Sequence, residues 1–199
     1  MIEGREMMRA ADNPYAVDRV LRVRYRPRGW NWPGLMDRLA ELRYRAAIVG
    51  PEGSGKTTLA EDLAARLAER GMRPRFAILN RQNRRLQADL FPWLRDAGPA
   101  DVLCLDGCEQ LGPIAWRRLL WRCRSLGGLL ITTHRPGRLP TLVQCDTDAQ
   151  LLIDLARELS PDEPCTSADA EQLWRARDGN LRLALRDLYD RWWQRRVWP

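Results

Sequence analysis

The stretch that decides the fold is Gly50-Pro51-Glu52-Gly53-Ser54-Gly55-Lys56-Thr57-Thr58. It fits the pattern GxxxxGK[ST], in which glycines let backbone N–H groups close around phosphate oxygens. The apolar run Arg45 to Val49 precedes it, and Leu59, Leu63 and Leu67 recur after it at four-residue intervals. A buried strand, a glycine-rich turn and an amphipathic helix are therefore predicted in that order.

This loop predicts binding of a nucleoside triphosphate together with Mg²⁺. Lys56 is expected to reach the β- and γ-phosphates, the Thr57 hydroxyl to ligate Mg²⁺, and Thr58 to contact the α-phosphate. The N-terminus of the following helix points its positive end at the same anion. The predicted nucleotide-binding residues are Gly50, Pro51, Glu52, Gly53, Ser54, Gly55, Lys56, Thr57 and Thr58.

Lys56 is also the only lysine among the 33 lysine and arginine residues of the chain. An ammonium group is a compact point charge, whereas a guanidinium is a wide planar fork. A tight phosphate cradle accepts the first and crowds out the second, so this position is expected to need lysine.

A second apolar run, Asp101 to Leu105, is predicted to be a strand and ends at Asp106. A carboxylate there is expected to hold Mg²⁺ through water. Glu109 is the candidate to orient the attacking water. The alternative for Glu109 is a solvated first-turn residue that stabilises the following helix.

Polar residues also end a later predicted strand, Gly128 to Thr133. Carboxyl-end residues of parallel strands face the ligand crevice. Thr133 or His134 is therefore a candidate to contact the γ-phosphate or its water. The alternatives are a β-branched strand residue for Thr133 and a backbone-satisfied turn residue for His134.

The rest of the chain alternates predicted strands and helices up to about residue 146, and is helical afterwards. One of these helices is predicted over Arg81 to Ala97, with an interruption near Pro92, and Asp148 and Ser167 are candidate N-caps of later helices. Alternation of this kind predicts an α/β fold of three layers, with a mostly parallel sheet covered on both faces. We expect an N-terminal extension with a helix over residues 1–43, a nucleotide-binding core over 44–146 and a helical lid over 147–199.

These motifs resemble the P-loop NTPases, in the branch that inserts a strand between the P-loop strand and the Mg²⁺-acid strand. GPEGSGKTT resembles Walker A, VLCLDGCEQL resembles Walker B, and LLITTH lies where a sensor-one residue belongs. Gly179-Asn180-Leu181-Arg182 resembles the sensor-two GxxR of AAA+ proteins. The resemblance implies a compact AAA+-like ATPase in which Arg182 reaches the γ-phosphate from the lid.

Two features depart from the AAA+ pattern. Gly107 follows Asp106 where AAA+ proteins usually have Glu, and Glu109 comes two residues later, so efficient hydrolysis is in question. The link from His134 to a fifth predicted strand at Leu142 to Cys145 is also short. A parallel crossover normally needs a dozen or more residues, so we expect this strand to be absent or unusually connected.

Composition limits the remaining functions. Five cysteines without a repeating spacing argue against a disulfide framework or a structural zinc site. No apolar run approaches the ~20 residues that span a bilayer, and residues 1–12 lack the apolar core of a secretory signal, so a cytoplasmic location is expected. The formal net charge of +7 makes nucleic acid a candidate partner, although the arginines are spread along the chain.

The C-terminus combines tryptophans with arginines. Trp192, Trp193 and Trp198 lie among Arg191, Arg195 and Arg196. Such a tail could stack on bases or dock on a partner protein. Packing within the lid is the preferred interpretation.

The leading hypothesis is a Mg²⁺-dependent ATPase whose lid converts ATP occupancy into a partner interaction. ATP is preferred because the chain has no guanine-reading NKxD motif. The displaced Glu109 motivates the alternative of a non-hydrolysing nucleotide switch or scaffold. A small-molecule or nucleotide kinase is the third hypothesis, since arginines could hold a second anionic substrate.

Overall fold

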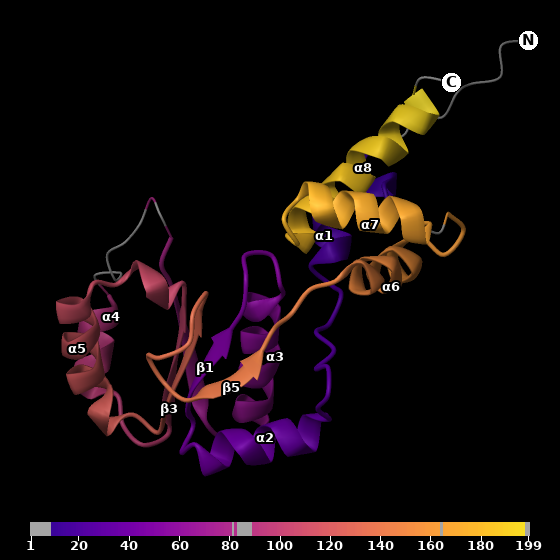
Figure 1. The fold of residues 1–199 in the computed structure, drawn as a ribbon. Helices are drawn as coiled ribbons and strands as arrows, with labels where there is room; N and C mark the ends of the chain where they lie inside the picture. The colour runs from indigo at the N-terminus through magenta and orange to yellow at the C-terminus, as the bar shows by residue number, and fades with distance from the viewer. Residues whose placement is uncertain (1–8, 81, 83–88, 164, 198–199) are drawn as a thin grey trace, which may run out of the picture. The chain divides into compact units, whose positions relative to one another are not determined.

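The computed structural model describes residues 9–80, 82, 89–163 and 165–197. The chain forms two compact units, one of residues Arg24–Asp146 and one of Met1–Val23 together with Thr147–Pro199. Each unit is a body of its own with its own hydrophobic core (Figure 1). In the described part of the chain, no helix has the length and apolar character needed to cross a membrane.

The unit Arg24–Asp146 is built on a five-stranded sheet. Each neighbouring pair of strands runs parallel, in the order β2-β3-β4-β1-β5, so β4 lies between β1 and β3. Parallel strands covered on both faces read as continuous apolar runs, and β4 is buried throughout. The strands are β1 Arg45–Val49, β2 Arg73–Ile78, β3 Asp101–Asp106, β4 Gly128–Thr133 and β5 Thr141–Gln144.

Helices cover the two faces of this sheet and complete three layers (Figure 1). Alternate residues of a strand point to opposite faces. Accordingly, Ala46 and Ile48 of β1 pack with α2 and α3, whereas Ala47 and Val49 pack with α4 and α5. The helices are α2 Trp32–Glu41, α3 Lys56–Glu69, α4 Leu90–Asp96 and α5 Pro113–Arg122, with 3₁₀ turns η2 Cys108–Gln110 and η3 Cys123–Ser125. The predicted α/β fold with a mostly parallel sheet is confirmed.

The predicted helix over residues 81–97 is seen only in its last part. Within the described residues, α4 spans Leu90–Asp96, and Pro92 occupies its first turn, where the missing N–H costs nothing. The part of the prediction that covers residues 81 and 83–88 lies outside the described residues.

The fifth strand is present. The short link of residues 134–140 can join β4 to β5 because it crosses the sheet as a loop and not as a helix. β5 pairs in parallel with β1, and the Ala47 N–H donates to the Pro140 carbonyl at 2.9 Å. The link of residues 134–140 forms no helix, and its Leu139 packs in the same cluster as Ala47 and Val49. A loop therefore covers the sheet where a crossover helix would need more residues.

The other unit is helical. Its helices bury Leu152, Leu173, Leu185 and Trp192 around one core, which also takes in Tyr15 from the N-terminal segment. Asp148 caps α6 through the Leu151 N–H, as predicted, but Thr166 rather than Ser167 caps α7. The elements are η1 Ala10–Asp12, α1 Val17–Val20, α6 Ala149–Leu159, α7 Ser167–Ala176 and α8 Leu181–Val197. The described residues 9–23 thus belong with the C-terminal helices and not with residues 24–43.

Candidate nucleotide-binding site

The loop between β1 and α3 needs its glycines for conformation and space. Gly53 and Gly55 have φ of 77° and 82°, the left-handed region that glycine adopts at no steric cost. A Cβ on Gly50 would lie 2.5 Å from the Cys145 carbonyl oxygen. The loop therefore passes close to β5 before α3 begins at Lys56, whose first N–H groups have no partner within the helix.

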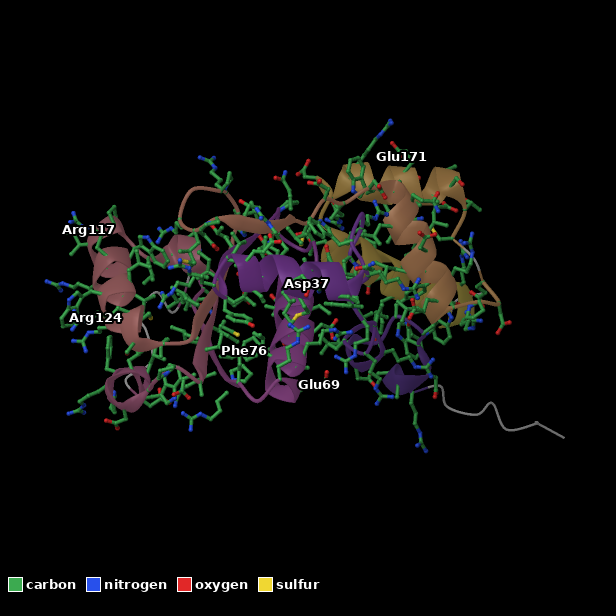
Figure 2. The ribbon with its side chains drawn as sticks, turned by 90° about the horizontal axis from the view of Figure 1, so that it is seen from below. Asp37, Glu69, Phe76, Arg117, Arg124 and Glu171 are labelled. Carbon is green, nitrogen blue, oxygen red and sulfur yellow. The ribbon has the colours of Figure 1, made fainter. Side chains whose placement is uncertain are left out.

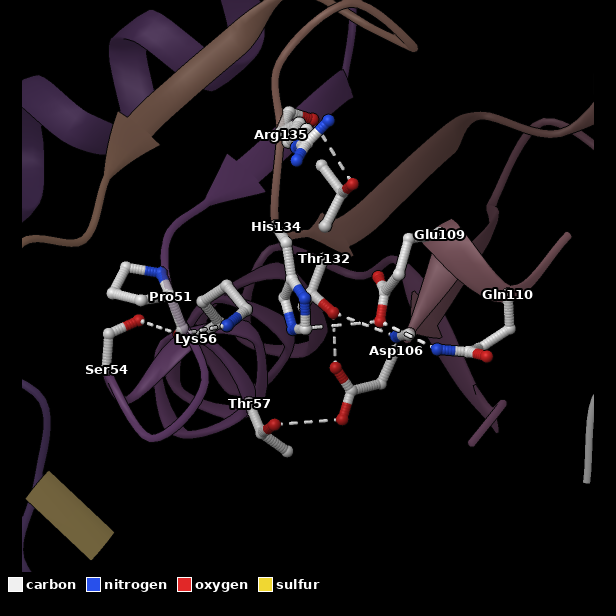
Figure 3. Close-up of polar contacts among 12 residues, drawn as sticks. Pro51, Ser54, Lys56, Thr57, Asp106, Glu109, Gln110, Thr132, His134 and Arg135 are labelled. Carbon is white, nitrogen blue, oxygen red and sulfur yellow. Dashed lines mark hydrogen bonds and ion pairs between the residues drawn. The ribbon is translucent and has the colours of Figure 1, made fainter. Parts of the chain in front are cut away.

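The Lys56 side chain folds back over this loop. Its Nζ donates to the Pro51 carbonyl at 2.6 Å, and the Ser54 hydroxyl donates to the same oxygen at 2.8 Å (Figure 3). The side chain is largely buried, and desolvation lowers the Lys56 pKa. An anion bound in the loop would oppose that shift and stabilise the ammonium form.

Three elements meet at the carboxylate of Asp106, at the end of β3. Its Oδ2 accepts a hydrogen bond from the Thr57 hydroxyl at 2.8 Å, and its Oδ1 accepts one from the Thr132 hydroxyl (Figure 3). The Thr132 oxygen in turn accepts the Gly107 N–H at 2.9 Å. The carboxylate is thus held on both oxygens beside the start of α3.

This donor set fits Mg²⁺. The ion prefers oxygen ligands and is usually bound by one or two protein groups plus phosphates and water. The Thr57 hydroxyl and the Asp106 carboxylate supply such a pair. Among the described residues, no group of three or more His, Cys, Asp and Glu side chains could hold a metal ion.

Thr132 is a site residue that is not among the predicted ones. The neighbouring Thr133 is among them, but its hydroxyl donates to the Arg135 carbonyl at 3.2 Å. Period-two reasoning could have distinguished the two. Leu130 packs on the α3 side of the sheet, so Thr132 points to that side and Thr133 to the other.

Glu109 lies on η2, beside Asp106 and Thr132 (Figure 3). Its Oε1 is 3.7 Å from His134 Nε2 and accepts a hydrogen bond from Gln110 at 3.3 Å. Its Oε2 is buried and has no hydrogen-bond partner among the described residues. The structure therefore brings together Glu109 and His134, with one carboxylate oxygen left to accept a hydrogen bond.

Gly107 explains why this glutamate stands two residues further along than in the AAA+ pattern. Its φ is 77°, and a Cβ there would lie 2.1 Å from the Leu79 carbonyl oxygen. No side chain fits at this position. The tight turn that follows returns the chain, so that Glu109 lies beside Asp106 despite its displacement.

A segment before α2 also contacts the loop, which the sequence did not indicate. The Tyr25 ring lies 3.1 Å from the place of a Cβ on Gly55, and its hydroxyl donates to Cys145 Sγ at 3.2 Å. Asp62 of α3 accepts the Tyr25 N–H at 3.1 Å and pairs with Arg24, also at 3.1 Å. These contacts fix the segment against the first turns of α3.

Three other predicted residues, Glu52, Thr58 and Arg182, make no contact with the Asp106 carboxylate among the described hydrogen bonds and ion pairs. Glu52 is exposed and Thr58 half-buried. Arg182 is exposed at the second position of α8, in the helical unit. Its predicted contact with the γ-phosphate stays a prediction.

The fold is similar to that of solved structures, whereas comparison by sequence finds no match. No family model matches the chain, and no curated protein matches it. Solved structures of Thermotoga maritima RuvB are similar: the one described as a Holliday junction branch migration motor has a TM-score of 0.55 and 21% identity over 84% of this chain and 63% of RuvB. A RuvB variant gives a TM-score of 0.52 and 22% identity over 76% of this chain and 57% of RuvB. The chain has a P-loop NTPase fold.

The chain spans roughly three-fifths of the length of the RuvB chains that it matches. The P-loop NTPase fold therefore accounts for the sheet and the loop at Gly50–Thr57.

Proposed function

We propose that this protein binds ATP with Mg²⁺ and hydrolyses it, and that the nucleotide state controls its interaction with a partner. The observation that carries the proposal is the contact of Thr57, Asp106 and Thr132 at one carboxylate, directly beside the phosphate loop. When bound, Mg²⁺ would neutralise charge on the phosphates. The sequence motifs that resemble Walker A and Walker B support the same proposal.

Each residue of the site has a chemical role in this proposal. The N–H groups of the loop and of the α3 N-terminus bind phosphate oxygens, and Lys56 moves from the Pro51 carbonyl to the phosphates. Glu109 accepts the proton of the attacking water at Oε2, which has no hydrogen-bond partner among the described residues. His134 and Gln110 orient the other oxygen of Glu109.

The helical unit is proposed to respond to the nucleotide as a lid, with Arg182 as its sensor of the γ-phosphate. Exchange of Arg182 for Ala is expected to lower turnover while ATP still binds. Arg186→Ala, an exposed change on the same helix, is the matched control. Equal effects of the two changes would remove Arg182 from the mechanism.

The test of hydrolysis is ATP binding and turnover with and without Mg²⁺. Lys56→Ala should lose ATP binding, whereas Glu109→Gln should bind ATP but lose turnover by about 10²–10⁴-fold, the usual contribution of a general base. Glu69→Gln, at the exposed end of α3, should behave like the wild type. Turnover unaffected by Lys56→Ala, or equal with and without Mg²⁺, would contradict the proposal.

A non-hydrolysing switch is the second candidate, and Gly107 favours it, because the position after Asp106 cannot carry a carboxylate. In that case the wild type binds ATP tightly, and its slow turnover is the same in Glu109→Gln. RuvB is described as a branch migration motor acting on Holliday junctions, so nucleic acid is the partner class to add first in either assay.

A further inference from the structure

The chain carries a long stretch without acidic residues. Leu111 to Cys145 contains no Asp or Glu in 35 residues, whereas the average of 26 acids in 199 residues would place four or five there. The same stretch holds six arginines, namely Arg117, Arg118, Arg122, Arg124, Arg135 and Arg138. Four of the six lie on α5 and η3.

The outward face of α5 combines arginine with large apolar side chains. The spacing i, i+3, i+4, i+7, i+8 places on one face Ile114, Arg117, Arg118, Trp121 and Arg122. The exposed fraction is 71% for Ile114 and 59% for Trp121. Figure 2 shows Arg117 and Arg124 pointing away from the ribbon. The opposite side of α5 anchors it to the sheet through Leu119.

Among the described residues, the guanidinium groups of this face have no hydrogen-bond or ion-pair partner. In the described part of the chain, Arg117 and Arg118 make no ion pair, and neither do Arg122 and Arg124. Arg124 lies 4.5 Å over the Trp121 ring, and Arg122 lies 5.3 Å over the ring of Phe91, an exposed residue of α4. Cation–π contacts use the ring face and leave the N–H groups available to an anion.

We propose that this α4–α5 surface, made of Phe91, Ile114, Arg117, Arg118, Trp121, Arg122 and Arg124, binds single-stranded nucleic acid. The arginines contact phosphates, and the exposed rings stack with bases, a combination typical of single-strand binding. Paired bases are already stacked in a duplex and cannot use Trp121 and Phe91. The surface binds without ATP, since none of its residues belongs to the nucleotide site.

A membrane surface fits these residues less well. An interfacial amphipathic helix needs one continuous apolar face separate from its charges. On α5 the apolar Ile114 and Trp121 share their face with Arg117 and Arg118. The arginines would enter the lipid together with the apolar groups.

The test is binding of a fluorescein-labelled 20-nucleotide oligo(dT) in EDTA, without ATP, at about 100 mM salt. The triple variant Arg117→Gln/Arg118→Gln/Arg122→Gln should bind at least about tenfold more weakly than the wild type. The control Arg157→Gln/Arg175→Gln/Arg186→Gln removes the same charge from exposed positions of the helical unit and should stay within about twofold. Equal losses in both triple variants would overturn the proposal, because overall charge alone would then explain binding.

Two further variants separate the contribution of stacking from that of charge. Trp121→Ala should weaken oligo(dT) binding at least about fivefold, because base–ring stacking is a main part of single-strand affinity. The triple Arg→Lys variant keeps the charge and should recover most of the lost binding.

Duplex DNA bound as tightly as oligo(dT), or anionic vesicles bound in place of it, would overturn the assignment. Circular dichroism and melting of each variant show that the fold is intact.

Discussion

Two helices of this protein are rich in arginine and tryptophan, yet they use these residues in opposite ways. On α5, Trp121 is 59% exposed and Arg117 and Arg118 have no acidic partner among the described residues. On α8, Trp192 is only 7% exposed and packs edge-on against Trp193 in the core of the helical unit. A similar composition therefore makes an open surface in one unit and a packed interior in the other.

The difference comes from neighbouring elements and not from the helices themselves. Arg191 pairs with Asp169 at 3.4 Å, and Arg196 pairs with Glu163, whose Oε2 accepts at 3.1 Å. Both acids lie in or just before α7, which packs against α8. The sequence around α5 offers no such acids, because none occurs from Leu111 to Cys145. The preferred sequence interpretation of the C-terminus, packing within the helical unit, agrees with Trp192 and Trp193.

The largest expected contrast concerns stability. Trp192→Ala removes a large side chain from the helical core and should destabilise that unit by about 3–5 kcal/mol. Trp121→Ala removes an exposed ring and should change the free energy of unfolding by about 0.5 kcal/mol or less. Denaturant unfolding followed by far-ultraviolet circular dichroism compares the two. Similar losses from both changes would show that Trp121 also supports packing.

The next contrast concerns salt. If about three phosphates are contacted on α5, oligo(dT) binding should fall roughly 20-fold between 50 and 200 mM salt, from a slope of about −0.7 per contact. Removing Arg117, Arg118 and Arg122 should flatten this dependence, while Arg195→Gln on α8 should leave it unchanged. The slopes come from titrations at four or five salt concentrations. A slope that falls equally in both variants would place the contacts on both helices.

A single change can make α5 resemble α8. Ile114 is 71% exposed and lies four residues before Arg118, so Ile114→Glu supplies an ion-pair partner without disturbing the core. Oligo(dT) binding should weaken about fivefold, whereas Ile114→Gln, of the same shape but without charge, should change it less than twofold. Unfolding of both variants should match the wild type within about 0.5 kcal/mol. Unchanged binding in Ile114→Glu would exclude Arg118 and its neighbours from the contact.

The nucleotide-binding unit could be predicted from sequence in most of its elements. The strands expected at Arg45–Val49 and Gly128–Thr133 have these bounds in the structure, because a parallel sheet buried on both faces demands continuous apolar runs. The loop at Gly50–Thr57 was equally clear, since its chemistry restricts nearly every position. Asp106 followed from the strand that it ends.

What the sequence did not indicate depends on contacts between distant residues. Asn13 donates to the Tyr189 carbonyl at 3.0 Å, 176 positions away, so no local pattern could assign the first residues to the helical unit. Tyr25 and Asp62 meet for the same reason. Thr132 is different, because strand periodicity alone places it on the same side of the sheet as Leu130. The role of Gly107 depends on the position of the Leu79 carbonyl, just after the neighbouring strand β2.

The smallest expected effect tests whether the arginines of α8 are held by their acids. The hydrogen bonds from Arg196 lower the pKa of Glu163. Because the folded-state pKa lies below the unfolded value of about 4.3, the pair stabilises the protein above that value, and the contribution is lost as pH falls through the folded-state pKa. Glu163→Gln should therefore cost about 0.2–1 kcal/mol at pH 7, the range of surface pairs, and progressively less below pH 4.

Denaturant unfolding of wild type and Glu163→Gln between pH 7 and pH 3 measures this difference. In an Arg196→Gln background the Glu163→Gln change should have almost no effect at either pH, because its partner is gone. A cost that is the same at pH 7 and pH 3, or that persists without Arg196, would mean that α8 does not rely on this ion pair. Arg196 would then have no stabilising ion pair, and the contrast with α5 would rest on the Arg191–Asp169 pair and on the buried Trp192.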